Sequence, residues 1–127
     1  GSYDSVFSLH CFMHLRLEDI HRVLHECRRV LRRGGTMVFD YPNALRRRLV
    51  GHRATGWHAG TALGADELRG LWGTSWRLVE LRGLALAPIH RLPHAVRPAF
   101  RAAEVLLGRT PLKHLASYHL VKLEKLD

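Results

Sequence analysis

The sequence is short of acidic side chains, of cysteine and of long apolar runs. Its 127 residues hold eleven Asp and Glu against twenty Lys and Arg, which gives a formal net charge of +9 with neutral histidines. It has two cysteines, Cys11 and Cys27, which excludes a disulfide-rich scaffold and leads us to expect reduced thiols in a cytoplasmic protein. No apolar stretch approaches the roughly 20 residues of a membrane-spanning helix, and no signal peptide is visible.

Recognised metal-binding motifs are also missing, although the chain has ten histidines. His10 and His14 are four residues apart, as are His21 and His25, and such pairs can chelate zinc from one face of a helix. There is, however, no CxxC or HExxH pattern, and an acidic third ligand is lacking. We therefore expect solvated histidines and no metal site.

The basic residues allow a hypothesis of nucleic-acid binding. The tripeptide 46–48 (RRR) is followed by His52 and Arg53, with Trp57 beyond them as a platform for stacking. The other arginines are scattered along the chain, and net charge bears on association rather than on fold. Solvated helix faces are therefore the favoured interpretation and nucleic-acid binding the less favoured one, while an anionic substrate or a membrane surface stays open as a partner.

The stretch from Tyr3 to Asn43 has the pattern of a strand, a helix and a second strand. Residues 5–9 form a short apolar run that suits a strand buried on both faces. One helical stripe follows, made by Ile20, Val23, Leu24, Cys27, Val30 and Leu31. Residues 36–41 (TMVFDY) are then expected as the second strand.

Glycine and proline set the limits of these elements. We expect Gly34 and Gly35 to form the left-handed C-cap of the helix. Pro42 should close the second strand, since it cannot donate to a sheet ladder. Two strands joined by one helix are parallel and cross over right-handedly in nearly all cases, so this part of the chain predicts a βαβ unit.

Past Asn43 the elements are less regular. Glycine and proline positions predict a loop or short helix over 44–64 and a helix over 65–71 that is ended by Gly73. Apolar alternation then predicts a strand over 76–86 with a bulge at Gly83. An extended connection over 87–98, a helix to about Leu107 and a strand over 118–126 are expected to follow.

Taken in order, these segments resemble the carboxyl half of a class I S-adenosylmethionine-dependent methyltransferase. Residues 3–6 (YDSV) are similar to the FDxV that begins the family's strand four, and 9–15 (LHCFMHL) to the xxVLHHL after it. Residues 29–35 (RVLRRGG) resemble RVLKPGG, with Arg33 in place of proline, and 36–43 (TMVFDYPN) resemble xLvfdxPN. A looser likeness to the segment before strand six rests on His58, Thr61, Leu63, Glu67, Leu68 and Trp76.

The resemblance implies an α/β fold. Sheets of this family have the order 3-2-1-4-5-7-6, with the last strand antiparallel, and residues 1–127 would supply strands four to seven as a single domain with flanking helices. Gly1 and Ser2 look like a cloning scar.

The resemblance also implies transfer of the sulfonium methyl of S-adenosylmethionine to an N, O or C acceptor, a reaction that depends mainly on positioning. Ligands of open α/β sheets lie beyond the carboxyl ends of the strands. The candidates there are Ser8, Leu9 and His10 for the donor, His14 and His58 as general base, and Tyr41, Asn43 and Trp57 for the acceptor. For each of them, packing or loop capping is the alternative role.

The family's glycine-rich turn after strand one and its acidic residue after strand two have no counterpart in this sequence, so we expect the chain to be inactive by itself. Three hypotheses follow. The chain is part of a methyltransferase; or it is a non-catalytic remnant that pairs along strand four, as a homodimer or with a missing amino-terminal half; or it is a basic nucleic-acid-binding module.

Overall fold

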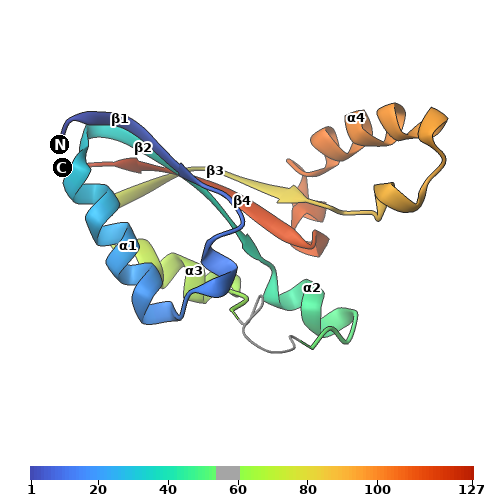
Figure 1. Cartoon of the computed structure of the whole chain (residues 1–127), viewed down its shortest axis with the longest axis horizontal. Coiled ribbons are helices and arrows are strands. Elements are labelled where there is room, and N and C mark those ends of the chain that lie inside the picture. Colours follow the sequence, from blue (N-terminus) through green and yellow to red (C-terminus); the bar gives the residue numbers. More distant parts are fainter. Residues whose placement is uncertain (54–60) are drawn as a thin grey trace.

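A computed structural model, which describes residues 1–53 and 61–127, contains a four-stranded sheet (Figure 1). The strands are β1 (Tyr3–Ser8), β2 (Leu31–Pro42), β3 (Trp76–Leu84) and β4 (Tyr118–Lys125), in the spatial order β1-β2-β4-β3. β1 and β2 are parallel, whereas β4 is antiparallel to both of its neighbours. This is the expected order of the family's strands four, five, seven and six, with one opposed strand, so the predicted fold class is confirmed.

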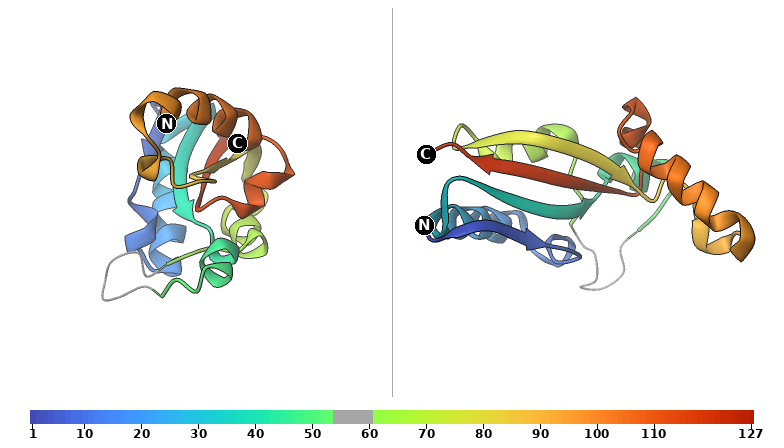
Figure 2. Two further views of the ribbon diagram at one scale, coloured as in Figure 1. Left: turned by 90° about the vertical axis from the view of Figure 1, so that its right-hand side faces the viewer. Right: turned by 90° about the horizontal axis from the view of Figure 1, so that it is seen from above.

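Helices lie on one face of the sheet and at one end of it. α1 (Leu17–Val30) and α3 (Ala65–Trp72) cover the same face, as Figures 1 and 2 show. α2 (Ala44–Leu49) follows the carboxyl end of β2, and α4 (Arg97–Leu107) lies beyond the end of β3 (Figure 1). Four 3₁₀ turns complete the described chain: η1 (Phe12–His14), η2 (Ile89–Arg91), η3 (His94–Val96) and η4 (Pro111–Leu115).

The core lies between the sheet and the α1–α3 layer, and the period of two along each strand builds it. Met37 pairs with Leu123 and Phe39 with Val121 across the β2–β4 ladder, and all four side chains are fully buried. Phe12, from η1, stacks on Phe39 with ring centroids 4.5 Å apart. Ile20 and Leu24 of α1, part of the predicted helical stripe, complete this cluster.

The opposite face of the sheet is largely open. Val38 and Phe7 are register partners in the β1–β2 ladder and belong to this face, and Phe7 is 78% exposed. In the sheet of the described residues β1 is an edge strand, because it pairs with β2 alone. The edge expected along strand four is therefore present.

The prediction that Gly34 and Gly35 cap the helix was wrong. α1 ends at Val30, and Leu31 is already extended, with φ −72° and ψ 140°. Gly34 does adopt the left-handed conformation, with φ +73°, but within β2. There the pairing moves from Tyr3–Leu31 to Ser5–Thr36, so the glycine accommodates a bulge that realigns two parallel strands.

The bulge predicted at Gly83 was also misplaced. The register of β3 shifts between Leu78 and Glu80. Gly83 instead permits a close approach: its N–H donates to the Gly108 carbonyl at 2.8 Å, and a Cβ there would lie 2.7 Å from the Cα of Lys113. The segment 87–98, predicted to be extended, contains the turns η2 and η3 and the first residues of α4.

Gly83→Ala should destabilise the chain, because the added methyl would meet backbone of η4 that cannot move aside. We expect a loss of roughly 1–3 kcal/mol in the free energy of unfolding, measured by urea denaturation. The matched control is Gly70→Ala in α3, where an added Cβ meets nothing within 4 Å, and a gain of about 0.5–1 kcal/mol is expected. A loss from both substitutions would contradict this assignment.

Candidate functional site

The residues predicted to contact the donor lie together at the carboxyl end of β1. Ser8 is the last residue of the strand and pairs with Phe39 of β2. Leu9 is 55% exposed. His10 has φ +55°, a left-handed conformation that is uncommon for a residue with a side chain. The chain therefore turns sharply where the donor was expected.

A buried carboxylate holds this turn. Asp40 of β2, 3% exposed, accepts the backbone N–H of His10 through Oδ1 at 2.6 Å. Its Oδ2 lies 3.5 Å from Nδ1 of the His10 ring, which is itself mostly exposed. An unusual backbone conformation that the surrounding structure enforces is a mark of functional sites.

Sequence reasoning missed Asp40, because it was counted within an apolar strand. The available signal was its charge: an acidic residue in a buried run is rarely left without a partner. The partner is a backbone N–H thirty residues earlier in the chain, and the sequence alone cannot identify it.

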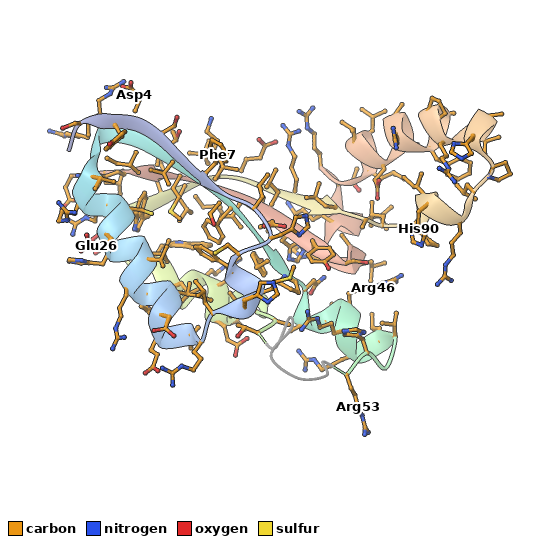
Figure 3. The ribbon with its side chains drawn as sticks, in the orientation of Figure 1. Asp4, Phe7, Glu26, Arg46, Arg53 and His90 are labelled. Atoms are coloured by element: carbon orange, nitrogen blue, oxygen red, sulfur yellow. The ribbon has the colours of Figure 1, made fainter. Side chains whose placement is uncertain are left out.

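A basic cavity of about 390 Å³ lies beside this turn, between α2 and the start of β4. Its lining residues are Pro42, Arg46, Arg47, Val50, His52, Ser117 and Tyr118. Figure 3 labels Arg46 on α2, at the end of the molecule where β2 finishes. Partial burial lowers the pKa of Arg47 from its ordinary value, but an arginine remains protonated at neutral pH. The cavity is therefore suited to an anionic group.

One ring contact joins the donor side to this cavity. The His10 ring meets the Tyr118 ring edge-on, with centroids 6.0 Å apart and planes at 83°. Tyr118 also lines the cavity. The expected donor wall and the basic cavity are therefore neighbours at the carboxyl ends of β1 and β2, where open α/β sheets bind ligands.

Tyr41 and Asn43, the predicted acceptor residues, are occupied by contacts within the fold. Tyr41 is 2% exposed within the core, and burial raises the pKa of its phenol well above the usual value. Asn43 caps α2 by accepting the N–H of Leu45 at 3.0 Å, and its amide donates to the carbonyls of His114 and Ala116, both at 2.8 Å. Their assignment to the acceptor stays a prediction.

Three candidate residues remain, of which only His14 is among the described residues. His14 is an exposed residue of η1, and its role as a general base stays a prediction. Trp57 and His58 lie outside the described residues. Among residues 1–53 and 61–127, no three His, Cys, Asp or Glu side chains lie close enough to hold a metal ion.

His119 of β4 is a buried histidine that follows Tyr118 in the chain. Its Nε2 lies 2.9 Å from the Lys113 carbonyl, which can only accept, so Nε2 carries the proton. Its Nδ1 is buried without a hydrogen-bond partner among the described residues. Burial lowers the pKa of His119 below the usual 6.5, because a charged ring would be poorly solvated there.

The chain should therefore lose stability in mild acid. Below about pH 6.5 the unfolded chain protonates at this position while the folded chain resists it, so the free energy of unfolding falls as the pH falls. Urea denaturation at pH 7.5 and pH 5.5 measures the loss. His119→Gln, which retains a donor for the Lys113 carbonyl, should show a smaller loss; an equal loss in both proteins would exclude His119 as the source.

Residues 1–39 match the model of a family described as the methyltransferase domain. No curated protein matches the sequence.

Solved structures match over nearly the whole chain. A chain from the Haloferax volcanii complex of the Trm112 methyltransferase activator with a methyltransferase is 18% identical, with a TM-score of 0.57 over 99% of this chain and 55% of that one. An S-adenosylmethionine-dependent methyltransferase of Archaeoglobus fulgidus is 14% identical, with a TM-score of 0.61 over 98% of this chain and 60% of that one.

A third structure is geranyl diphosphate C-methyltransferase of Streptomyces coelicolor A3(2), in complex with Mg²⁺, geranyl diphosphate and S-adenosyl-L-homocysteine. It is 13% identical, with a TM-score of 0.51 over 97% of this chain and 46% of that one. The chain thus spans less than two thirds of each of the three structures. It has the fold of class I S-adenosylmethionine-dependent methyltransferases, and its first 39 residues carry the sequence pattern of their methyltransferase domain.

Proposed function

We propose that the chain forms one wall of an S-adenosylmethionine-dependent methyltransferase whose acceptor carries an anionic group. The observation that supports this most strongly is the meeting of two features at the carboxyl ends of β1 and β2. One is the left-handed turn at His10 and the other is the basic cavity beside it. The match of residues 1–39 to the methyltransferase domain supports the same reaction.

On the donor side, the chain contributes backbone and a histidine. S-adenosylmethionine supplies a methyl group on a sulfonium, and the protein's part is to orient it and to exclude water. Asp40 fixes the turn at His10 and leaves Leu9 at the surface. The described residues offer only this wall, since the glycine-rich cradle of the family has no counterpart in the sequence.

Proton removal from the acceptor has a candidate in His10 as well as in His14. Asp40 Oδ2 lies 3.5 Å from Nδ1 of the His10 ring, an arrangement in which a carboxylate orients an imidazole. The exposed ring lies against Tyr118 of the cavity. His10 would thus serve the acceptor as a base, whereas its backbone borders the donor.

On the acceptor side, Arg46, Arg47 and His52 supply the recognition. Arginine side chains bind carboxylates and phosphates with paired hydrogen bonds. The structure from Streptomyces coelicolor, which has the same fold, contains geranyl diphosphate. An acceptor with a carboxylate or phosphate group close to its methylated atom would fit the cavity and the turn together.

If Ser8, Leu9 and His10 border the methyl donor, a donor analogue should contact these residues and not others. S-adenosylhomocysteine added to the ¹⁵N-labelled 127-residue chain should shift the amide resonances of Leu9 and His10, even if binding is weak. Adenosine, which lacks the amino-acid part, should shift them much less. Shifts confined to other segments, or none at saturation, would count against the donor site.

The basic cavity predicts binding of inorganic pyrophosphate. Replacing both arginines by alanine (Arg46→Ala with Arg47→Ala) should weaken binding by roughly tenfold or more, since a hydrogen bond to a charged group contributes about 1.5–3 kcal/mol. Calorimetry measures the effect. The matched control, Arg33→Ala with Arg69→Ala, removes two exposed arginines at the start of β2 and in α3 and should bind as the unchanged chain does. Equal weakening in the two double variants would show a nonspecific effect of net charge.

The exposed edge of β1 favours a second candidate function, self-association or partner binding. Unpaired strand edges recruit other strands, and Phe7 adds apolar surface next to this edge (Figure 3). The molecular mass of the chain in solution, measured on the same labelled samples, distinguishes self-association from the methyltransferase function. A dimer whose β1 resonances depend on concentration would favour this candidate, and a monomer would exclude self-association through the edge.

A further inference from the structure

The charged side chains of α4 face inward. Arg97, Arg101 and Glu104 are spaced as one helical stripe and line a hollow against the connection from β3. The Arg97 guanidinium donates to the carbonyls of Leu92 at 2.8 Å and of His90 at 2.9 Å. Glu104 accepts the N–H of Leu86 at 2.6 Å. The polar face of α4 thus holds the helix to its own connecting segment.

The outward side of α4 is apolar. We define the outer face of α4 as Ala99, Phe100, Ala102, Ala103, Val105, Leu106 and Leu107. No residue of the helix is buried, and Leu106 is 66% exposed. This reverses the usual arrangement, in which a surface helix buries its apolar stripe and shows its charges to water. A contiguous apolar surface of this kind marks an interaction site.

The segments next to this surface are basic. Residues 84–117, which contain α4 and the turns beside it, have five Lys and Arg and one acidic residue, Glu104. Arg97 and Arg101 belong to the inward stripe, which leaves Arg91 in η2, Arg109 after α4 and Lys113 in η4 as the basic residues beside the helix. The turn η4 contacts α4 and adds Leu112 and Leu115, which are 45% and 43% exposed. The surface therefore combines exposed apolar side chains with a local excess of positive charge.

We propose that the outer face of α4 docks onto an anionic lipid surface. An amphipathic helix with leucine and phenylalanine on one side and basic residues around it lies in the plane of a membrane interface. Anionic headgroups would attract the surrounding cations. Among the described residues no helix is long and apolar enough to cross a membrane, so α4 rests in the interface and does not span it.

Charge favours a lipid surface over a second copy of this chain. Each copy has a net charge of +9, so apposing two of these surfaces would bring like charges together. The apolar positions also extend around most of the helix instead of following the narrow stripe of a helix pair. A broad apolar arc suits insertion into a fluid interface.

The position of α4 gives docking a consequence for the rest of the molecule. Figures 1 and 2 show α4 at the end of the sheet where β1 and β2 finish, away from the α1–α3 layer. The basic cavity lies at the same end. Docking would turn this end toward the membrane, although the inference itself does not depend on methyl transfer.

Vesicle flotation of the 127-residue chain tests the proposal. We expect binding to phosphatidylcholine vesicles that contain phosphatidylglycerol, and little binding to phosphatidylcholine alone. Leu106→Glu should reduce binding to the anionic vesicles roughly tenfold or more, because it removes a large apolar side chain from the contact and adds a negative charge. Leu17→Glu makes the same change at an exposed leucine of α1 and should retain the original binding.

Three results would overturn the proposal: no binding of the folded chain to anionic vesicles, equal loss in both variants, or retained binding in Leu106→Glu. Size-exclusion chromatography adds a further test. A dimer that Leu106→Glu converts to a monomer would assign the outer face of α4 to a second copy of the chain. Circular dichroism confirms that the variants are folded.

Discussion

The ladder between β2 and β4 is the interaction on which the rest of the structure depends. It joins residues 36–42 to residues 118–124, which are far apart in the sequence. Its inner side supplies the buried pairs of the core, and its outer side carries Asp40. The same ladder places Tyr118 opposite Pro42, beside the basic cavity. The core and the candidate site therefore lie on opposite faces of the same pair of strands.

Asp40 connects this ladder to the turn after β1. Its carboxylate is buried and accepts a backbone N–H, and a buried charge without such a partner would be costly. The turn in return holds His10 against Tyr118. The sheet thus maintains the left-handed backbone at His10 through this hydrogen bond.

Much of the fold followed from the sequence, because the apolar period of each element is a local property. The βαβ unit and the helix ended by Gly73 came from such patterns, whereas the strand order was implied by the resemblance to the methyltransferase family. The sequence does not show which distant segments approach each other closely. Gly83 lies against Gly108 and Lys113, whereas the sequence pattern predicts a local bulge at this glycine. The same limit hid Asp40, whose partner, His10, lies in the turn after β1.

The orientation of α4 shows this limit most clearly. The sequence predicts a helix over these residues but does not say which side faces the protein. Hydrogen bonds from Arg97 and to Glu104 fix the polar side inward, because the carbonyls and N–H groups of the connecting segment need partners. The apolar side is consequently left outside. With no buried residue of its own, this helix is held by hydrogen bonds to the connecting segment, and its apolar side is the surface for which we propose a membrane.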